Sequence, residues 1–338
     1  MPIFSTGAVP GGSIAAELSS LTRRAFIPRV TVQIYYATPT LMLLLGGAQR
    51  SAGGLNPITG PVQGTSMVQG TYTGYSGNFQ KPSVIPGVTN YQFNTAYYTV
   101  PVPLMMGEAL VQSSEVVVPI LDVRMNDVFS TTVQQLSTGL FANNSANALM
   151  PSSFVDGFDN GTNVATYGGI NRLAAGNSYW QGQYYASAGA VLTRSALASY
   201  LVQVTAKAGG DSPDFVVMSP SDYATLQSDF IGTETIYVVP GKEYSADTDA
   251  RHGFRCLNID GVPFFMDYFC PKGTLYMVNS KYMTAYLDEN AAFSFSGFKS
   301  GIPVLSISQV GVMLLGHQFI CSKPSSCAVV TGITGGAF

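Results

Sequence analysis

The stretch YGGINRLAAGNSYW, which ends at Trp180, gathers residue types that often take part in chemistry. Gly168 and Gly169 permit positive φ angles and a close approach of the backbone to a ligand or to another segment. Tyr167 and Trp180, the only tryptophan of the chain, combine an apolar ring with a polar group, and Arg172 adds a charge. These residue types suit either a ligand pocket or a structural corner, and they favour the corner.

The rest of the sequence supplies no recognisable active site. An enzyme needs a nucleophile, a base and an orienting group, or a glycine-rich cradle for a cofactor. The two histidines, His252 and His317, have no motif partner. Asp247 and Asp249 fit a solvated loop better than a cation site. We therefore predict no catalytic residue, no cofactor and no metal, and hence a protein that is not an enzyme.

The four cysteines do not indicate a metal site. Cys256, Cys270, Cys321 and Cys327 include no Cys-x-x-Cys pair, and no histidine stands at zinc-finger spacing from them. Free buried thiols are the better interpretation.

Charged residues are scarce in this sequence. They make up 10% of the 338 residues, against about 25% in an average soluble domain. Between residues 51 and 107 the only charged residue is Lys81, and residues 128–155 contain none. Interface cores lose charged groups and keep Tyr, Phe and Met, so such stretches favour either a membrane or a surface that other protein covers.

The sequence argues against a membrane and against nucleic-acid binding as the main activity. Its strongest apolar run, LMLLL at residues 41–45, is far shorter than the ~20 residues of a membrane-spanning helix. The N-terminus has no basic region leading into an apolar core, so cytosolic synthesis is expected. A net charge of −3 gives no basic footprint for DNA, although it is compatible with enclosing a polyanion without gripping it.

The first third of the chain predicts a short helix and a hairpin. Residues 1–37 are mixed and predict an arm or an irregular lead-in. Thr38-Pro39 supplies an N-cap and a first helical position, and Gly46-Gly47 ends the short helix between them. Two alternating stretches, residues 61–74 and 91–106, predict the long strands of a hairpin. Because charged gatekeepers are almost absent from these strands, we expect another subunit to cover them.

The remaining chain mixes helices and strands, which indicates an α+β fold. Apolar spacings of three and four predict a long amphipathic helix over residues 115–141, and residues 143–166 predict an extended connection. Asp260-Gly261 between two apolar runs predicts a β-hairpin. The further expectations are helices over 191–210 and 219–230, strands over 214–219, 274–279 and 283–288, and strands or apolar helix over 304–330.

Four stretches follow one another in a characteristic order. They are YGGINRLAAGNSYW, PDFVVMSPSDYATLQ, GFRCLNIDGVPFFMDYFCPKGTLYMVNSKYM and QFICSKPSSCAVVTGI. In these stretches and in their order the chain resembles the major capsid proteins of tailed bacteriophages with the HK97 fold. The first is similar to that family's Tyr-Gly-Gly-Ile motif followed by Arg and Trp, and the others to its strand-then-helix segment, its hairpin run and its closing strands. The resemblance covers most of the chain from Pro39 onward.

The resemblance implies an α+β, HK97-like fold with four parts. These are an N-terminal arm and short helix (1–47), a projecting E-loop β-hairpin (48–107), a peripheral domain with a long spine helix (108–160 and 276–318), and an axial domain (161–275 and 319–338). It also implies self-assembly through pentamers and hexamers into an icosahedral shell, which encloses double-stranded DNA without sequence-specific binding. Portal, scaffolding and decoration proteins are further partners of the family. The implied location is the virion, after synthesis in the cytoplasm of a bacterial host.

Eight residues receive structural or assembly roles in this interpretation: Tyr167, Gly168, Gly169, Arg172, Trp180, Lys81, Asp260 and Gly261. The first five form the corner where the chain leaves the peripheral domain for the axial one. Trp180 is expected to anchor packing there, and Arg172 to make a structural contact. Some family members crosslink an E-loop lysine to an asparagine of a neighbour. Lys81 is the only lysine of the expected E-loop, but the sequence does not establish an acceptor, so it does not predict a crosslink.

The chain also departs from the family. It carries less charge in the expected E-loop and spine helix, so its shell contacts should be unusually apolar. No long, charged, helical segment precedes the arm, so a cleaved prodomain is not expected. Two alternatives stay open: an encapsulin-like compartment that encloses cargo enzymes, and a carbohydrate-binding or hydrolytic protein that uses the Tyr- and Trp-rich residues 167–185.

Overall fold

The computed structural model describes residues 38–46, 49–51, 56–66, 72, 75, 87–105, 120–147, 149–233, 256–297, 299–300 and 308–334. Lys81, His252, Asp247, Asp249 and the expected arm lie outside these residues. The chain divides into two units. The described parts of unit 1 come from Tyr98–Gln135 and Phe293–Leu315, and those of unit 2 from Ala37–Tyr97, Leu136–Ala292 and Gly316–Phe338. Helices and strands are mixed, so the predicted α+β class is confirmed.

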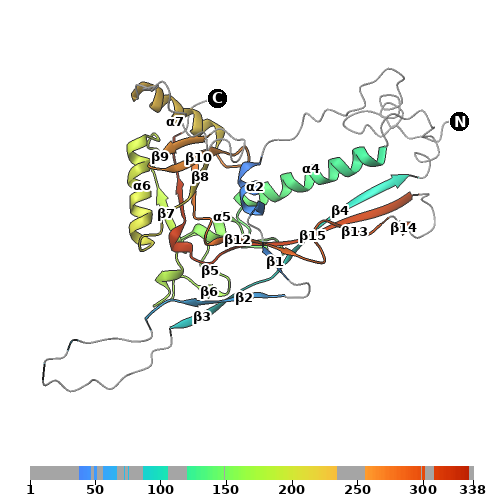
Figure 1. Ribbon diagram of the computed structural model, residues 1–338, viewed down its shortest axis with the longest axis horizontal. Coiled ribbons are helices and arrows are strands. Elements are labelled where there is room, and N and C mark those ends of the chain that lie inside the picture. Colours follow the sequence, from blue (N-terminus) through green and yellow to red (C-terminus); the bar gives the residue numbers. More distant parts are fainter. Residues whose placement is uncertain are drawn as a thin grey trace. The chain divides into compact units, whose positions relative to one another are not determined.

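Unit 2 contains a six-stranded sheet with the order β7-β16-β11-β8-β10-β9. Figure 1 labels β7, β8, β9 and β10 of this sheet. Two of its pairings, β7 with β16 and β8 with β10, are parallel, and the other three are antiparallel. The strands are β7 Gln183–Ala186, β8 Phe215–Met218, β9 Cys256–Ile259, β10 Val262–Met266, β11 Thr274–Val278 and β16 Ala328–Thr331.

Helices cover both faces of this sheet. Helices α6 (Arg194–Lys207) and α7 (Pro220–Thr233) pack on one face, where alternate apolar residues of β8 and β11 join them in one core. On the other face, Tyr276 of β11 meets the rings of Phe154 and Phe158 from helix α5 (Phe154–Phe158), at 5.8 and 6.4 Å between centroids. The first core consists of Leu192, Leu197, Leu201, Val204, Val216, Met218, Tyr223, Leu226, Ile259, Phe264, Leu275, Met277, Ala328, Val330 and Ile333.

A second sheet is organised around the 14-residue strand β15 (Ser308–Cys321). In unit 2 its end pairs antiparallel with β12 (Met283–Asp288), which pairs in parallel with β1 (Gln49–Ser51). In unit 1 its beginning pairs with β13 (Ser294–Phe295), β14 (Lys299–Ser300) and β4 (Ala96–Met105). The expectation of strands or helix over 304–330 is thus resolved as two strands, β15 and β16.

Helix α4 (Ile120–Phe141) is the longest described helix, and its residues up to Gln135 belong to unit 1. Val128 packs there with Val102 and Met313 in a small core. The predicted helix over 115–141 is therefore confirmed from Ile120, while residues 115–119 lie outside the described part of the chain.

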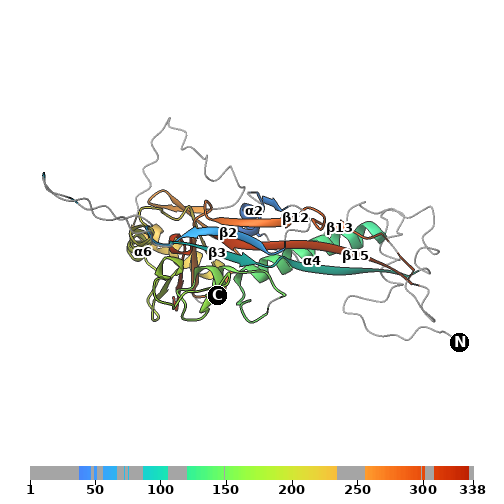
Figure 2. The ribbon, with the colours of Figure 1, turned by 90° about the horizontal axis from the view of Figure 1, so that it is seen from below.

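The predicted long hairpin is only partly correct. Strands β2 (Ile58–Gln63) and β3 (Val88–Phe93) do pair antiparallel, and Figure 2 shows them side by side. The stretch predicted as one strand over 91–106 is divided, however, because β3 ends at Phe93 and β4 begins at Ala96. At the break, side chains form hydrogen bonds with backbone groups that would otherwise continue the strand. Asn94 O accepts from Gln318 Nε2 at 2.7 Å, and Thr95 N donates to Asn56 Oδ1 at 3.2 Å.

Other local predictions can be compared directly with the structure. The short helix is confirmed as α2 (Pro39–Gly46), and Asp260-Gly261 does join β9 to β10 in a hairpin. The extended connection over 143–166 is wrong in one part, because it contains helix α5 (Phe154–Phe158). Ser153 and Asp156 form a capping box that starts this helix. None of the described helices combines the length and the hydrophobicity that crossing a membrane would need.

Candidate functional site

The backbone of the corner is a tight hairpin in unit 2. Strands β5 (Thr166–Tyr167) and β6 (Ile170–Asn171) pair antiparallel, and Gly168 and Gly169 form the turn with φ angles of 58° and 81°. Two successive positive φ angles are the geometry that favours glycine in a two-residue hairpin. At Gly168 a side chain would also collide, since an added Cβ would lie 2.7 Å from Cζ of Phe93.

Arg172 is fully buried directly after this hairpin. Its guanidinium donates to three backbone carbonyls: Nε to Trp180 O at 3.1 Å, Nη1 to Val164 O at 3.3 Å and Nη2 to Gly157 O at 2.7 Å. Burial lowers the pKa of the guanidinium, and Tyr167 and Asp159 oppose that effect. One side chain therefore holds three separate backbone segments together.

Trp180 closes the corner from the other side. It lies at the end of the 3-10 helix η1 (Ser178–Trp180), is 0% exposed, and donates from Nε1 to Tyr167 O at 2.9 Å. Its ring stacks on Tyr91, with 5.7 Å between centroids and 17° between planes. Because the indole is enclosed, it has no free face to stack on a sugar, and this counts against the carbohydrate-binding alternative.

The base of the β2–β3 hairpin is attached to this corner. Gln92 N donates to Gly168 O at 2.9 Å, and the rings of Phe93 and Tyr167 meet edge to face at 4.8 Å. The contribution of Tyr91 and Phe93 was not predicted from the sequence. Their alternation with exposed neighbours indicates an inward face, but not which residues that face would meet.

The segments around the corner are also fixed by hydrogen bonds to the carboxylate and the backbone carbonyl of Asp159. Asp159 Oδ2 accepts from the N–H groups of Gly161, Asn163 and Val164 at 2.8, 3.0 and 2.9 Å. Gly182 N donates to Asp159 O at 2.9 Å, and a Cβ on Gly182 would lie 2.2 Å from Phe158 O. The chain here is packed too closely to accept a side chain.

Tyr167 connects the corner to the end of β15. Its hydroxyl accepts from Cys321 N at 2.9 Å, and its ring lies 4.6 Å from Arg172 Cζ. Burial, with Cys321 as a smaller cause, raises the pKa of the phenol well above its usual range. Tyr167 therefore serves as a neutral acceptor and packing group rather than as an acid or base.

The other predicted site residues lie apart from the corner. Asp260 and Gly261 form an exposed turn with φ angles of 51° and 82°, between the two strands at the β9 edge of the sheet. The corner leads into β7, which is the opposite edge of the same sheet. His317 is buried in β15, with its ring 5.5 Å from that of Phe319. Within the described ranges, no three His, Cys, Asp or Glu side chains are grouped so that they could hold a metal ion.

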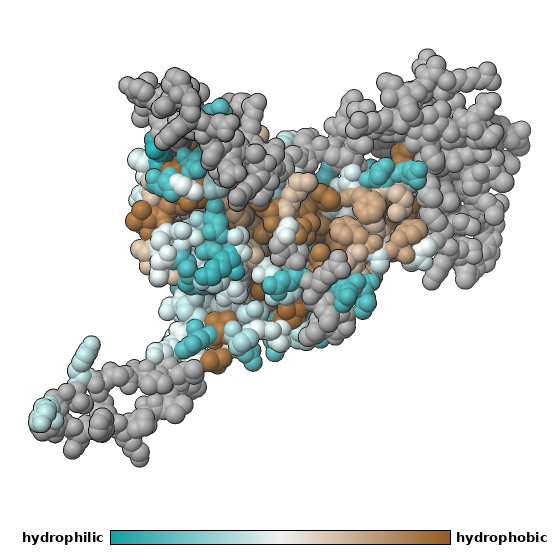
Figure 3. Space-filling model, viewed as in Figure 1, coloured by the Kyte–Doolittle hydropathy of each residue, from teal (hydrophilic) through white to brown (hydrophobic). Residues whose placement is uncertain are grey.

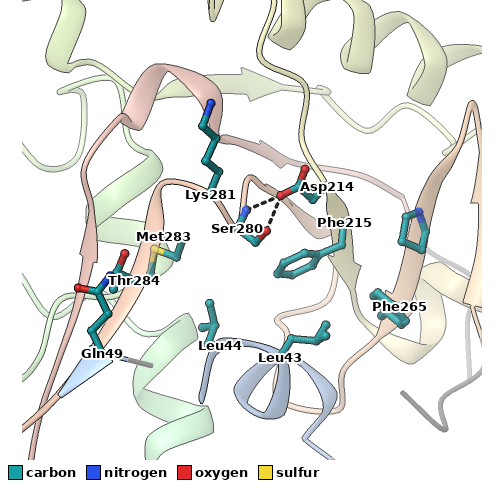
Figure 4. A pocket seen from close by; sticks show the side chains of 11 residues that line it. Leu43, Leu44, Gln49, Asp214, Phe215, Phe265, Ser280, Lys281, Met283 and Thr284 are labelled. Carbon is teal, nitrogen blue, oxygen red and sulfur yellow. Dashed lines mark hydrogen bonds between the residues drawn. The ribbon is translucent and has the colours of Figure 1, made fainter. Parts of the chain in front are cut away.

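A cavity of about 490 Å³ lies elsewhere in unit 2, between α2, the start of β8 and β12 (Figure 4). Leu43, Leu44 and Phe215 give it apolar walls. The amine of Lys281 points away from it, and Asp214 accepts hydrogen bonds from Ser280 N and Oγ. The cavity therefore has a mixed lining, with apolar walls beside polar residues such as Gln49 and Thr284.

Comparison with known proteins identifies the fold. No protein-family model matches the sequence, and no curated protein matches it. Solved structures do match along nearly the whole chain. The structure described as the "Cyanophage A-1(L) capsid asymmetric unit" has a TM-score of 0.69 at 12% identity, covering 92% of this chain and 97% of that chain. The "Capsid of native GTA particle" has a TM-score of 0.58 at 10% identity, covering 96% and 100%.

A protein compartment matches as well. The SrpI encapsulin of Synechococcus elongatus PCC 7942 has a TM-score of 0.52 at 12% identity, covering 92% of this chain and 95% of that chain. Capsid proteins of this kind are structural rather than enzymatic. The chain therefore has the HK97-like fold of capsid and shell proteins, which is the fold that its sequence motifs resemble.

Proposed function

We propose that the chain is a major capsid protein, which self-assembles through pentamers and hexamers into an icosahedral shell around double-stranded DNA. The observation that carries the proposal is the shared fold with the cyanophage A-1(L) capsid protein, over 92% of this chain and 97% of that one. A match of that extent leaves no room for an added catalytic domain within the aligned part. The proposed location is the virion, after synthesis in a bacterial host.

The exposed surface supports contacts with other copies. Figure 3 shows hydrophobic surface at separate places, including over helix α2 and along helix α4. Met42 of α2 is 63% exposed, Val202 of α6 is 67% exposed, and Leu149 is 82% exposed. Scattered apolar residues are normal on a protein surface, but here they accompany an unusually low charge content. Copies of the chain that cover these surfaces would account for both features.

Within this proposal the described elements correspond to the parts of a capsid subunit. We assign β2 and β3 to the E-loop (48–107), α4 to the spine helix of a peripheral domain (108–160 and 276–318), and the six-stranded sheet to an axial domain (161–275 and 319–338). Because β11 ends at Val278, the boundary expected at residue 275 has to move to the end of this strand. The N-terminal arm (1–47) ends in α2. Neither β2 nor β3 pairs with a further strand among the described residues, and the outer edge of β3 donates a backbone hydrogen bond to the corner, from Gln92 N to Gly168 O. Strand edges that stay unpaired accept other protein.

The proposed role of the corner follows from its contacts. Arg172, Trp180 and the glycine turn fix the base of the hairpin on the body of unit 2, through Gln92 N and the rings of Tyr91 and Phe93. A hairpin that must reach a neighbouring subunit needs a rigid base, because its orientation decides where its tip lies. The residues Tyr167, Gly168, Gly169, Arg172 and Trp180 would thus act in assembly indirectly, through the orientation of the hairpin.

Nuclease protection of native particles tests the proposal. Particles are treated with a DNase, the nuclease is inactivated, and nucleic acid and protein are then extracted and sized. Long double-stranded DNA that resists the nuclease until the shell is opened is the expected result. The encapsulin match supports a second candidate, a compartment for protein. Particles that contain a stoichiometric second protein and no protected DNA would establish that candidate instead.

A further inference from the structure

Two buried cysteines lie close together where β15 ends and β16 is about to begin. Cys321 is the last residue of β15 and Cys327 immediately precedes β16, with the 3-10 turn η2 (Pro324–Ser326) between them. Both side chains are 0% exposed, and their Sγ atoms are 3.9 Å apart. Neither is bonded to another cysteine. The two strands that they flank, β15 and β16, belong to different sheets.

The surroundings of this pair stabilise a negative charge on one of the two sulfurs. Cys327 Sγ accepts from Asn279 N at 3.5 Å, and the hydroxyl of Ser326 lies 3.9 Å away. Burial alone would raise the pKa of Cys327, but hydrogen bonds from Cys321, Asn279 N and Ser326 outweigh it and lower that pKa. The hydrogen bond to Cys327, together with burial, raises the pKa of Cys321 well above its usual range. Cys321 is thus the thiol that donates the hydrogen bond, and Cys327 is the sulfur that forms a thiolate more readily.

The third described free cysteine lacks these features. Cys270 is also buried, but its Sγ lies beside carbonyl oxygens, Pro271 O at 3.9 Å and Thr274 O at 3.5 Å. Burial, with Asp267 and Asp222 as smaller causes, raises the pKa of this thiol well above its usual range. Since thiolates are the reactive form of cysteine, Cys270 is the less reactive site. It provides an internal reference for any oxidation of the pair.

We propose that Cys321 and Cys327 are a disulfide-forming pair, which a small two-electron oxidant such as hydrogen peroxide converts into an internal crosslink between β15 and β16. The Cys327 thiolate attacks one peroxide oxygen, the O–O bond breaks, and a sulfenic acid and hydroxide form. The Cys321 sulfur then attacks the Cys327 sulfur, and the S–O bond breaks. With the thiol protons taken up, the products are one disulfide and two water molecules. The sulfur atoms must move from 3.9 Å to about 2.05 Å.

A small oxidant reaches the sulfurs only when the turn between the cysteines opens locally. Ser322, Lys323 and Ser325 are each partly exposed, but Pro324 and Ser326 are buried. Hydrogen bonds hold the turn, from Ser326 N to Lys323 O at 3.1 Å and from Lys323 Nζ to Ala208 O at 2.8 Å. A disulfide would add a covalent bond across this turn and restrict the unfolded chain, which stabilises the fold. The inference holds for a single subunit as well as for a shell, so it does not depend on what the shell encloses.

Mass spectrometry on the full chain tests the proposal. The reduced protein is treated with increasing hydrogen peroxide, quenched, denatured, alkylated and digested with trypsin. Because trypsin does not cleave before Pro324, one peptide contains both cysteines. We expect this peptide to lose two hydrogens and to escape alkylation at doses that leave Cys270 alkylated. Treatment with dithiothreitol before alkylation should restore both alkylation sites, and the oxidised protein should melt at a higher temperature than the reduced protein.

Two variants complete the experiment. Cys270→Ser leaves the pair intact and should show the same oxidation and the same rise in melting temperature. Cys321→Ser keeps Cys327 but cannot form the bond, so its melting temperature should not rise with oxidation. If either variant fails to fold, the wild-type protein alone can still overturn the proposal. The proposal is wrong if Cys321 and Cys327 can still be alkylated at doses that oxidise Cys270, or if the two residues carry separate sulfinic acids.

Discussion

The corner around Trp180 and the β2–β3 hairpin touch each other but are stabilised in different ways. In the corner, Arg172 and Trp180 are fully buried, and their nitrogen donors are paired with backbone carbonyls. In the hairpin, at least half of the residues of β2 and of β3 are exposed. These two strands pair only with each other among the described residues. The corner is complete within the subunit, whereas the hairpin, in the proposed shell, would be completed by a neighbouring subunit.

Because of this difference, substitutions in the two regions should affect different properties: the stability of the subunit for the corner, and its association with other copies for the hairpin. Substitutions in the corner should lower the stability of the subunit itself, since they leave polar groups unpaired or create clashes in the interior. Substitutions on the exposed side of the hairpin should leave the subunit stable and affect only its association. The following changes test that separation, and they are arranged from the largest expected effect on subunit stability to the smallest.

Replacing Arg172 with Met should have the largest effect. The change leaves the carbonyls of Trp180, Val164 and Gly157 buried without their donor. We expect a loss of about 3–5 kcal/mol in the free energy of unfolding, measured by urea denaturation of the unassembled subunit. Arg172→Lys is the matched control, and it should recover only part of the loss because one ammonium group cannot reach all three acceptors. A loss below about 1 kcal/mol for Arg172→Met would show that the corner does not depend on this side chain.

Replacing Trp180 with Ala should cost nearly as much. The variant loses the stack on Tyr91 and the hydrogen bond to Tyr167 O, and it leaves a cavity. Large-to-small changes of this kind cost about 3–5 kcal/mol, and the yield of shells should fall with them. Trp180→Phe retains a stacked ring and should lose about 1–2 kcal/mol, mainly for the unpaired carbonyl. Normal stability and normal assembly of Trp180→Ala would contradict the role given to the corner.

Replacing Gly182 with Ala tests how closely the corner is packed. The new Cβ would lie 2.2 Å from Phe158 O, a backbone atom that cannot move without its segment. We expect a loss of about 1–3 kcal/mol in thermal or urea unfolding. Gly139→Ala in α4 is the control, since an added Cβ there meets no atom within 4 Å. That control should stabilise the helix by up to about 1 kcal/mol. Equal effects of the two variants would be inconsistent with the close approach at Gly182.

Asp156 should make the stability of the corner region depend on pH. Burial raises the pKa of this carboxyl, while hydrogen bonds from Ser153 and Ser145 oppose the shift. Because the folded state then binds the proton more tightly than the unfolded state, stability is lost as pH rises from the usual Asp range through the raised pKa. Each unit by which the pKa is raised contributes about 1.4 kcal/mol.

Urea unfolding between pH 4 and pH 7, compared for wild type and Asp156→Asn, measures this effect. The advantage of the wild type over the variant should grow as pH falls. The hairpin strands contain no Asp, Glu or His, so a hairpin variant should show the pH dependence of the wild type. An advantage that shrinks as pH falls would mean that the pKa of Asp156 is lowered in the folded protein instead.

Replacing Val88 with Lys should have the smallest effect on the subunit. Val88 is 51% exposed at the start of β3, so the free energy of unfolding should change by no more than about 0.5 kcal/mol. Shell assembly, followed by sedimentation, should nevertheless fall, since a charge would enter a contact with a neighbouring subunit. Val88→Thr, which keeps the shape and adds no charge, is the control. Unchanged assembly of Val88→Lys would remove this part of the hairpin from the proposed contact.

Much of the fold could be predicted from local patterns. The glycine pairs and Asp260-Gly261 indicated turns because positive φ angles favour these residues, and apolar spacing indicated α4, α6 and α7. Helix α5 was missed although Ser153 and Asp156 form a capping box, since a five-residue helix is too short to show an apolar period. The division of β3 from β4 was missed because it depends on Gln318, which is remote in sequence.

The contacts of the candidate site were much less predictable. The sequence singled out Arg172 and Trp180 by their rarity, but the acceptors of Arg172 are backbone carbonyls, and those have no residue-type signature. The stack of Tyr91 on Trp180 joins two distant segments, and only the folded chain brings them together. The cysteine pair is similar, because the turn that brings Cys321 and Cys327 to 3.9 Å could not be read from their spacing.

Electron microscopy of the purified chain tests the central claim most directly. The chain is expressed alone, concentrated under several ionic and pH conditions, and examined in negative stain. The account predicts closed shells, or rings with five-fold and six-fold symmetry, for the wild type and for Gly139→Ala. A chain that remains a small, folded monomer under every condition would contradict it.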